Sequence, residues 1–233
     1  DDPFLLRFGR YIVNAVQGDL GRSIRGQTPV MQEILDRLPS TAQLAFAAVI
    51  FATLFGIPVG VIAAQSRGKL VDNAAMLTAL VGLSIPSFWL AIILIIIFGI
   101  NLKWISVTGG EGVKDLILPA FTLGLAPAAV LARLTRSSVL EVKEEDYVRT
   151  AHGKGLKKRT IQIRHILRNA LIPVITYLGM LFADLLGGTV FIESVFARPG
   201  LGRFAVNAIS ARDFPQVQGL VLFIATFYVV INL

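Results

Sequence analysis

Residues 41–64, TAQLAFAAVIFATLFGIPVGVIAA, form an apolar run that contains no charged side chain. A helix of about 20 apolar residues crosses the hydrocarbon core of a bilayer, which is roughly 30 Å thick. The same criterion selects four further stretches, namely residues 74–99, 116–132, 170–190 and 217–233. The sequence therefore predicts an all-α, polytopic transmembrane bundle with five spans.

The composition supports a membrane protein and excludes several other classes. Of the 233 residues, 55% are hydrophobic and 16% are charged, and the mean hydropathy is +0.70. Soluble domains are about 45–50% apolar and about 25% charged, and disordered chains are more polar still. The chain has no cysteine, which excludes a disulfide scaffold and a thiol enzyme.

The distribution of charge predicts the topology. Lysine and arginine outnumber acidic residues in residues 133–169, so the positive-inside rule places this loop in the cytoplasm. Alternation of the spans then places residues 1–40, 101–115 and 191–216 outside. We predict an extracytoplasmic segment at 1–40 and a membrane domain at 41–233. An external start with five spans predicts one further helix before Asp1, and therefore six in the complete chain.

The cytoplasmic loop has its own helical pattern. Residues 138–170 contain many helix formers and no proline, and are interrupted only by Gly153 and Gly155. We expect two short helices on either side of a glycine turn, the first of them amphipathic and covering residues 138–151. Such a projection could dock into a cleft of a cytoplasmic partner.

No pattern for cofactor, metal or catalytic chemistry stands in its required context. The sequence lacks a phosphate-binding loop, and its one dinucleotide-type glycine pattern, at 200–205, follows a proline in a predicted external loop. His152 and His165 have no ligand set beside them. We expect a chain that is not an enzyme, holds no cofactor or metal, and binds no nucleic acid.

Three polar or kinked positions within the spans are candidates for a pathway or gate. A carboxyl group inside a span, as at Asp184, is costly and normally faces a partner or a watery cavity. A structural hydrogen bond is the alternative role. Ser84 and Pro86 belong to the sequence Gly-Leu-Ser-Ile-Pro, which predicts a helix kink within the second span.

Small residues recur at four-residue spacing in two of the spans. They are Gly56 and Gly60 in one, and Gly179, Ala183 and Gly187 in the other. Such faces let helix backbones approach closely, and a pathway lining is the alternative interpretation.

Two segments of the cytoplasmic loop carry a resemblance to a known family. They read DYVRTAHGKGL at 146–156 and RHILRNALIPV at 164–174. These segments resemble the coupling loop of integral membrane permeases of ATP-binding-cassette (ABC) importers. They are most similar to the dipeptide, oligopeptide and nickel group, which includes glutathione-type importers, and to its first, or B-type, permease. The chain departs from that pattern at His152 and Gly153, where Arg and Ala are usual, and Gly153 is expected to loosen the coupling turn.

Further segments resemble the same family in order along the chain. They are residues 14–23, 55–61, 133–142, 198–203 and 212–219. Relative to that family, the sequence lacks the first helix and a short C-terminal tail.

The resemblance implies a type I ABC importer permease fold and a mechanical function. The chain would form half of a translocation pathway for small peptides or a related solute in a bacterial or archaeal cytoplasmic membrane. Its implied partners are a second permease, two ATPase subunits that bind ATP and Mg²⁺, an extracytoplasmic solute-binding protein and membrane lipid.

The resemblance also implies two sets of contact residues. The residues expected to couple to an ATPase subunit are Asp146, Tyr147, Arg149, Thr150, Ala151, His152, Gly153, Lys154, Gly155 and Leu156. The residues expected to meet the binding protein are Arg198, Pro199, Gly200, Arg203, Arg212 and Asp213.

Two other functions remain open at this point. An ion-coupled secondary transporter would use Asp184 as its coupling carboxylate, and a membrane scaffold would not transport at all. Dipeptides, longer peptides, glutathione, nickel chelates and opines are all compatible solutes.

Overall fold

The computed structural model describes residues 3–105 and 112–232, and this part of the chain is helical without a β-strand. The helices up to the middle of the chain are α1 (Phe4–Val16), α2 (Val30–Gln65), α3 (Leu70–Ser84), α4 (Ser87–Leu94), the π-helix η1 (Ile95–Asn101) and α5 (Val113–Lys143). They are followed by α6 (Asp146–Gly153), α7 (Lys158–Thr160), the π-helix η2 (Ile161–Leu167), α8 (Arg168–Ala170), α9 (Ile172–Val195), α10 (Leu201–Ser210) and α11 (Phe214–Asn232).

The helices are long and apolar enough to account for the predicted spans. Helices α2, α5 and α11 each meet the criterion alone, and two bent helix pairs meet it together. One pair joins α3 to α4 and η1, and the other joins the α7–α8 segment to α9. Counting each bent pair as one span gives five, as the sequence predicts.

The second predicted span, residues 74–99, is wrong as a single helix. It breaks between Ser84 and Ser87, and the two halves differ in direction by 93°. Ile85 has an extended backbone, with φ −79° and ψ 120°. The proline ring of Pro86 disfavours a helical conformation in the residue before it, which explains the position of the break.

Two predicted boundaries also differ in the structure. Helix α2 begins at Val30, after Pro29, so it extends across the predicted boundary at residue 40. Helix α5 continues to Lys143 and α6 begins at Asp146, so residues 138–151 belong to two helices rather than one. The break ends the long helix α5 and separates it from the short helix α6.

Helices α2 and α5 pack closely along their length. A Cβ atom added to Gly56 would lie 2.6 Å from the carbonyl oxygen of Ala128, and one added to Gly60 would lie 2.5 Å from that of Ala132. On α5, a Cβ atom on Gly124 would approach the carbonyl oxygen of Ala48 to 2.8 Å. Only glycine permits this separation, which confirms close packing as the role of the first small-residue pair.

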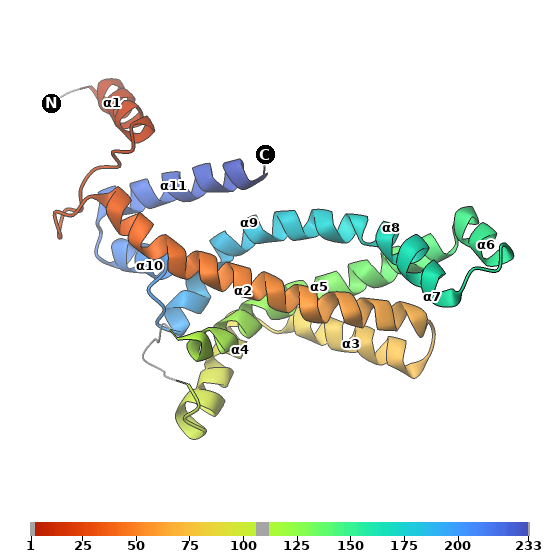
Figure 1. Ribbon diagram of the computed structural model, residues 1–233. Coiled ribbons are helices and arrows are strands. Elements are labelled where there is room, and N and C mark those ends of the chain that lie inside the picture. The colour runs from red at the N-terminus through yellow and green to blue at the C-terminus, as the bar shows by residue number, and fades with distance from the viewer. Residues whose placement is uncertain (1–2, 106–111, 233) are drawn as a thin grey trace.

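The helices arrange the predicted functional segments at opposite ends of the molecule. Figure 1 shows α6 at one end of the long α2 and α5 helices, whereas α10 and the start of α2 lie at the other. Helix α1 stands apart from the bundle at that second end (Figure 1). This separation agrees with the predicted placement of residues 133–169 on the opposite side of the membrane from residues 1–40.

Candidate functional site

Helix α6 has an inward and an outward face. Val148 and Ala151 are 2% and 4% exposed, and belong to one apolar cluster with Ala64 of α2 and Ile166 of η2. The outward face carries the exposed side chains of Asp146, Tyr147, Arg149, Thr150 and His152. The helix is therefore held to the membrane bundle by one face and leaves the other face open.

A glycine turn ends α6. The N–H of Gly155 donates to the carbonyl of His152 at 3.0 Å, and the N–H of Leu156 donates to that of Ala151 at 3.3 Å. This pair of bonds is a Schellman motif, which requires one residue in the left-handed backbone conformation. Gly155 is that residue, with φ +74°. Gly153 is the last residue of α6, and a Cβ atom there would meet nothing within 4 Å. The turn therefore depends on Gly155 and not on Gly153.

Side-chain bonds hold α6 to the segment that follows it. Nδ2 of Asn169, in α8, donates to Oη of Tyr147 at 3.1 Å. On the outward face, Arg149 and Asp146 form an exposed ion pair at 3.2 Å. Lys154 and Leu156 are exposed on the turn. The predicted coupling residues thus form one continuous projection, of which Ala151 is the buried support.

Two ion pairs connect the turn between α2 and α3 to α5. The buried carboxylate of Asp72 accepts from Nε and Nη2 of Arg136 at 2.5 and 2.7 Å, and from the N–H of Gly68 at 2.9 Å. The second pair, Arg67 with Glu144 at 2.8 Å, is exposed and lies where α5 ends before α6. The α2–α3 turn, the end of α5 and the base of α6 are therefore joined.

The six residues predicted to meet a binding protein differ in exposure. Pro199 and Arg212 are exposed, and Arg203 is half-buried. Arg198, Gly200 and Asp213 are buried within the chain, so these three predicted contact residues do not lie on its surface.

The buried glycines of this segment pack against a buried carboxylate, Glu193 of α9. Its Oε1 accepts from Oγ1 of Thr41 at 2.6 Å, and its Oε2 accepts from the N–H of Gly202 at 2.7 Å and of Arg203 at 3.2 Å. A Cβ atom at Gly200 would collide with this carboxylate. A negative group is favourable at the N-terminus of a helix, so Glu193 fixes the start of α10.

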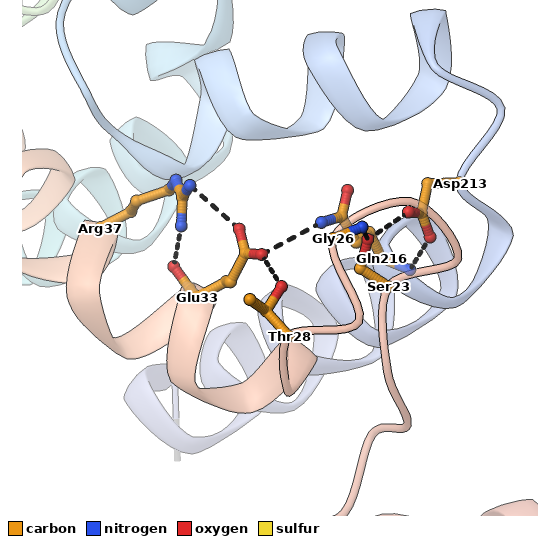
Figure 2. A network of polar contacts seen from close by, with 7 residues as sticks. All are labelled: Ser23, Gly26, Thr28, Glu33, Arg37, Asp213 and Gln216. Carbon is orange, nitrogen blue, oxygen red and sulfur yellow. Dashed lines mark hydrogen bonds and ion pairs between the residues drawn. The ribbon is translucent and has the colours of Figure 1, made fainter.

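Asp213 is the centre of a second polar network, at the end of the molecule where α10 and the start of α2 lie, and Figure 2 shows it. Its carboxylate accepts from Oγ of Ser23 at 2.6 Å and from the N–H groups of Ile24 and Arg25 at 3.0 and 3.4 Å. A fourth bond comes from the N–H of Gln216 at 3.4 Å. Burial acts to raise the pKa of Asp213, but these hydrogen bonds together outweigh it and hold the pKa below its ordinary value.

The same network continues into the first turn of α2. The side-chain amide of Gln216 donates to Oε1 of Glu33 at 3.4 Å, and the hydroxyl of Thr28 donates to the same oxygen (Figure 2). Nη2 of Arg37 forms an ion pair with Oε2 of Glu33 at 3.0 Å, and Nη1 of Arg37 donates to the backbone carbonyl of Glu33 at 2.7 Å. The segment before α2 is thereby fastened to the turn between α10 and α11.

The predicted pathway residues line two different pockets. Ser84 and Pro86 line a pocket of about 480 Å³ at the helix break, where the Ser84 hydroxyl donates to the carbonyl of Leu80 at 2.9 Å. Asp184 lines another of about 530 Å³ between α9 and α11, and accepts from Oη of Tyr228 at 3.3 Å. The structure does not bring these residues together within one chain.

Three polar groups at these sites were missed by sequence reasoning: Asp72, Glu193 and Ser23. Asp72 stands beside basic residues in a cytoplasmic turn, where an exposed position is the ordinary expectation. Glu193 lies three residues after the end of the predicted fourth span, and an isolated acid at that place is the only local signal for it. In all three cases the side chain that each group bonds is remote in the sequence, namely Arg136 for Asp72, Thr41 for Glu193 and Asp213 for Ser23.

The sequence comparisons agree with these arrangements. A family model described as "Binding-protein-dependent transport system inner membrane component" matches residues 56–233. The glutathione transport system permease protein GsiC of Escherichia coli strain K12 is 42% identical over 233 residues, which are all of this chain and 76% of that protein. GsiC of Salmonella paratyphi A has the same identity and coverage.

Solved structures show the same fold at lower sequence identity. A chain of the inward-facing MetNI methionine ABC transporter is 19% identical and has a TM-score of 0.71, with coverage of 87% of this chain and 92% of that one. A chain of an amino acid ABC transporter with histidines has a TM-score of 0.62 at 19% identity, over 86% and 88% of the two chains. These similarities support the fold that the helices display.

Proposed function

The chain belongs to the family of binding-protein-dependent transport system inner membrane components, and from this membership we propose that it forms half of a translocation pathway for small peptides of the glutathione class. It is a permease subunit of an ABC importer and a multi-pass protein of the cytoplasmic membrane. It works with partner permease and ATPase subunits and a binding protein, and ATP hydrolysis lies in the separate ATPase subunits. The chain itself is not an enzyme.

The proposed mechanism uses the outward face of α6 as the contact with an ATPase subunit. The observation that carries it is the division of α6 into a buried face, with Val148 and Ala151, and an exposed face, with Tyr147, Arg149 and Thr150. An ATPase that moves the exposed face would also move the apolar cluster beneath it, which includes residues of α2, α5 and η2. Binding and release of ATP in the partner could then change the packing of the spans.

The proposed assembly contains this chain, a second permease, two ATPase subunits and one solute-binding protein. ATP and Mg²⁺ would bind the ATPase subunits, and this chain would hold no cofactor. Pro199 and Arg212, which are exposed, would contact the binding protein. Arg203 would contribute through its half-buried side chain.

The proposed solute class rests on the relatives. Proteins named as glutathione permeases are 42% identical to this chain over its whole length. Glutathione is a tripeptide, so small peptides are the broader class to which the proposal extends.

Single cysteines test the proposed ATPase contact, because the chain has none of its own. We expect Arg149→Cys to crosslink to an ATPase subunit, with a yield that changes when ATP is added. Ala151→Cys is the matched control: it lies on the same helix but is 4% exposed, so it should crosslink poorly. Equal crosslinking at both positions, or free labelling of Arg149→Cys without any crosslink, would contradict the proposed contact.

Uptake by proteoliposomes that contain the complete importer tests the solute class. Accumulation of glutathione or a dipeptide should require both ATP and the binding protein. Uptake of a nickel chelate instead would replace the proposed solute, and uptake driven by an ion gradient without ATP would favour a secondary transporter.

A further inference from the structure

The pocket beside Asp184 is almost entirely apolar. It has a volume of about 530 Å³, within the ordinary range for small-molecule sites, and lies between α9 and α11. Leu38 of α2 and Leu201 of α10 contribute to its lining. Among the described residues that line it, Asp184 and Tyr228 are the two with polar side chains. A ligand in this pocket would meet polar side-chain atoms at one place.

Asp184 is an acidic residue of α9, within the part of that helix that belongs to a candidate membrane span. It is twelve positions after Ile172, where α9 begins, which corresponds to about 18 Å along the helix. Its side chain is exposed, and in residues 3–105 and 112–232 its single hydrogen bond comes from Tyr228 and it forms no ion pair. An acidic group within a span normally faces a partner or a water-filled cavity.

The surroundings of the carboxylate leave space for such a partner. Ala183 and Gly187 line the same pocket, and a Cβ atom on Gly187 would meet nothing within 4 Å. Phe223 and Phe227 of α11 also line the pocket, with their rings stacked at a centroid distance of 5.8 Å. The pocket therefore joins a carboxylate to an aromatic, apolar wall.

We propose that Asp184 and Tyr228 form a subsite for the ammonium group of a peptide solute during its passage through the membrane. This inference rests on the proposed function, because it assumes that the solute is a peptide. The N-terminal ammonium would bind the carboxylate of Asp184, and the rest of the peptide would contact the apolar wall. Aromatic rings in the lining of the same pocket also favour a cationic group.

A metal cation fits this pocket less well than an ammonium group. Ca²⁺ takes six to eight oxygen ligands and Mg²⁺ takes six, whereas the side chains here supply three oxygen atoms, two from Asp184 and one from Tyr228. The remaining lining side chains are hydrocarbon. A solute with one positive group and an apolar body matches this composition.

The first test measures the charge preference of the pocket in the complete importer. We would place a single cysteine at Ala225, which lines the pocket and leaves both Asp184 and Tyr228 in place. The measured quantity is the ratio of labelling by a cationic ethylammonium methanethiosulfonate to labelling by the anionic ethylsulfonate reagent. We expect this ratio to be about ten times higher at Ala225→Cys than at a free thiol in solution. Addition of Asp184→Asn should remove this preference. Mass spectrometry of this chain gives the extent of labelling.

Protection by solute makes the test specific for the ammonium group. A dipeptide should slow labelling of Ala225→Cys, and its N-acetylated form should not. Thr226→Cys is the matched control, because Thr226 is the next residue along α11 and does not line the pocket. Equal protection by both peptides, a preference that survives Asp184→Asn, or a pocket that stays unreactive in the assembled importer would each overturn the proposal.

Uptake then separates this inference from the proposed function. We expect Asp184→Asn to lower ATP-dependent uptake of a free-amine peptide about tenfold, while binding-protein-stimulated ATP hydrolysis continues. Asp184→Glu should recover part of the uptake. If the unmodified importer shows no ATP-dependent peptide uptake, the proposed function fails; if it does and Asp184→Asn transports equally well, only the ammonium subsite fails.

Discussion

Two glycines at the end of α6 have different backbone conformations, and only one of the two conformations requires glycine. Gly155 occupies the left-handed region at φ +74°, whereas Gly153 is helical and has open space where a Cβ atom would stand. Alanine is favoured over glycine in a helix but is disfavoured at positive φ. The departure at Gly153 therefore affects the stability of α6, and the turn itself depends on Gly155.

We expect alanine substitutions at these two positions to have opposite effects. Gly153→Ala should raise the free energy of unfolding by about 0.5–1 kcal/mol, and Gly155→Ala should lower it by about 1–2 kcal/mol. Thermal unfolding of the purified permease in detergent measures both. A shift in the same direction for the two variants would contradict this account of the turn.

A pH-dependent contact is expected at Asp213. Its pKa is lower in the folded protein than in the unfolded chain, so its stabilising contribution is present above the unfolded value of about 4 and is lost as the pH falls through the folded value. Spin labels at Gln27→Cys and Ile209→Cys report the distance between the two segments that Asp213 joins. We expect the distance distribution to broaden when the pH is lowered below about 4.

The matched variant for that measurement is Asp213→Asn. It retains the size of the side chain but cannot ionise, so its distance distribution should not respond to pH over the same range. A broadening of equal size in both proteins would assign the effect to other groups.

Residue-level predictions succeeded where the signal was local. The glycine turn of α6 follows from residues within one short segment, and its position was predicted correctly. The bonds of Asp72 with Arg136 and of Glu193 with Thr41 join residues 64 and 152 positions apart. No pattern in one sequence indicates such pairs, because either partner could equally be exposed to water.

At the scale of elements, the turn between α2 and α3 should depend on its buried ion pair more than on its exposed one. Asp72 is 1% exposed and binds Arg136 through both oxygens, whereas Arg67 and Glu144 are both largely exposed. Exposed pairs contribute little to stability, and loss of one partner from a buried pair leaves a charge uncompensated. We expect Asp72→Asn to lower the melting temperature by more than Arg67→Gln.

A double-mutant cycle identifies the source of that difference. If Asp72 acts through Arg136, adding Arg136→Gln to Asp72→Asn should lower the melting temperature by less than Arg136→Gln does alone. Strictly additive effects would show that the two side chains stabilise the turn independently.

The positions of helices were predicted more reliably than their breaks. Helices α2 and α5 each contain two prolines and remain continuous, whereas the span that contains Pro86 bends by 93°. Proline therefore does not decide between a kink and a break. Gly56 and Gly60 hold α2 against α5, but Ser84, Pro86 and Ser87 are exposed in this chain. That difference in packing is a tertiary property that the sequence pattern does not contain.

At the scale of the whole molecule, the α2–α5 contact should be sensitive to added volume. A methyl group at Gly60 would lie 2.5 Å from the carbonyl oxygen of Ala132, so the helices would have to separate. We expect Gly60→Ala to lower the free energy of unfolding by about 1–3 kcal/mol. Thermal unfolding in detergent, together with the yield of folded protein, measures the effect.

Gly179→Ala is the matched control for that substitution. Gly179 belongs to the second small-residue stripe, but a Cβ atom there would meet nothing within 4 Å of this chain. We expect Gly179→Ala to be neutral or stabilising by up to about 1 kcal/mol. Destabilisation of equal size at both positions would show that the effect is not one of helix separation.

The overall architecture was predicted from charge and hydropathy, because the bilayer constrains both. The five apolar stretches agree with the five spans that are obtained when each bent helix pair counts as one. The basic loop lies at the opposite end of the long helices from the start of α2, and its cytoplasmic side stays a prediction. The place of α10 against α9, which depends on Glu193, and the attachment of residues 23–25 to Asp213 were not predicted. Both depend on contacts between segments that are remote in the sequence.

The length of α2 has a mechanical consequence. Its 36 residues extend for about 54 Å, whereas the hydrocarbon core is roughly 30 Å thick, so it projects well beyond the apolar layer. Its first turns belong to the polar network around Glu33, and Ala64 in its last turn packs in the cluster beneath α6. Figure 1 shows α2 extending between these two ends of the molecule. A rod of this length that pivots by about 10° moves one end relative to the other by about 9 Å across its axis. Helix α2 can therefore act as a lever that carries displacement from one surface of the membrane to the other.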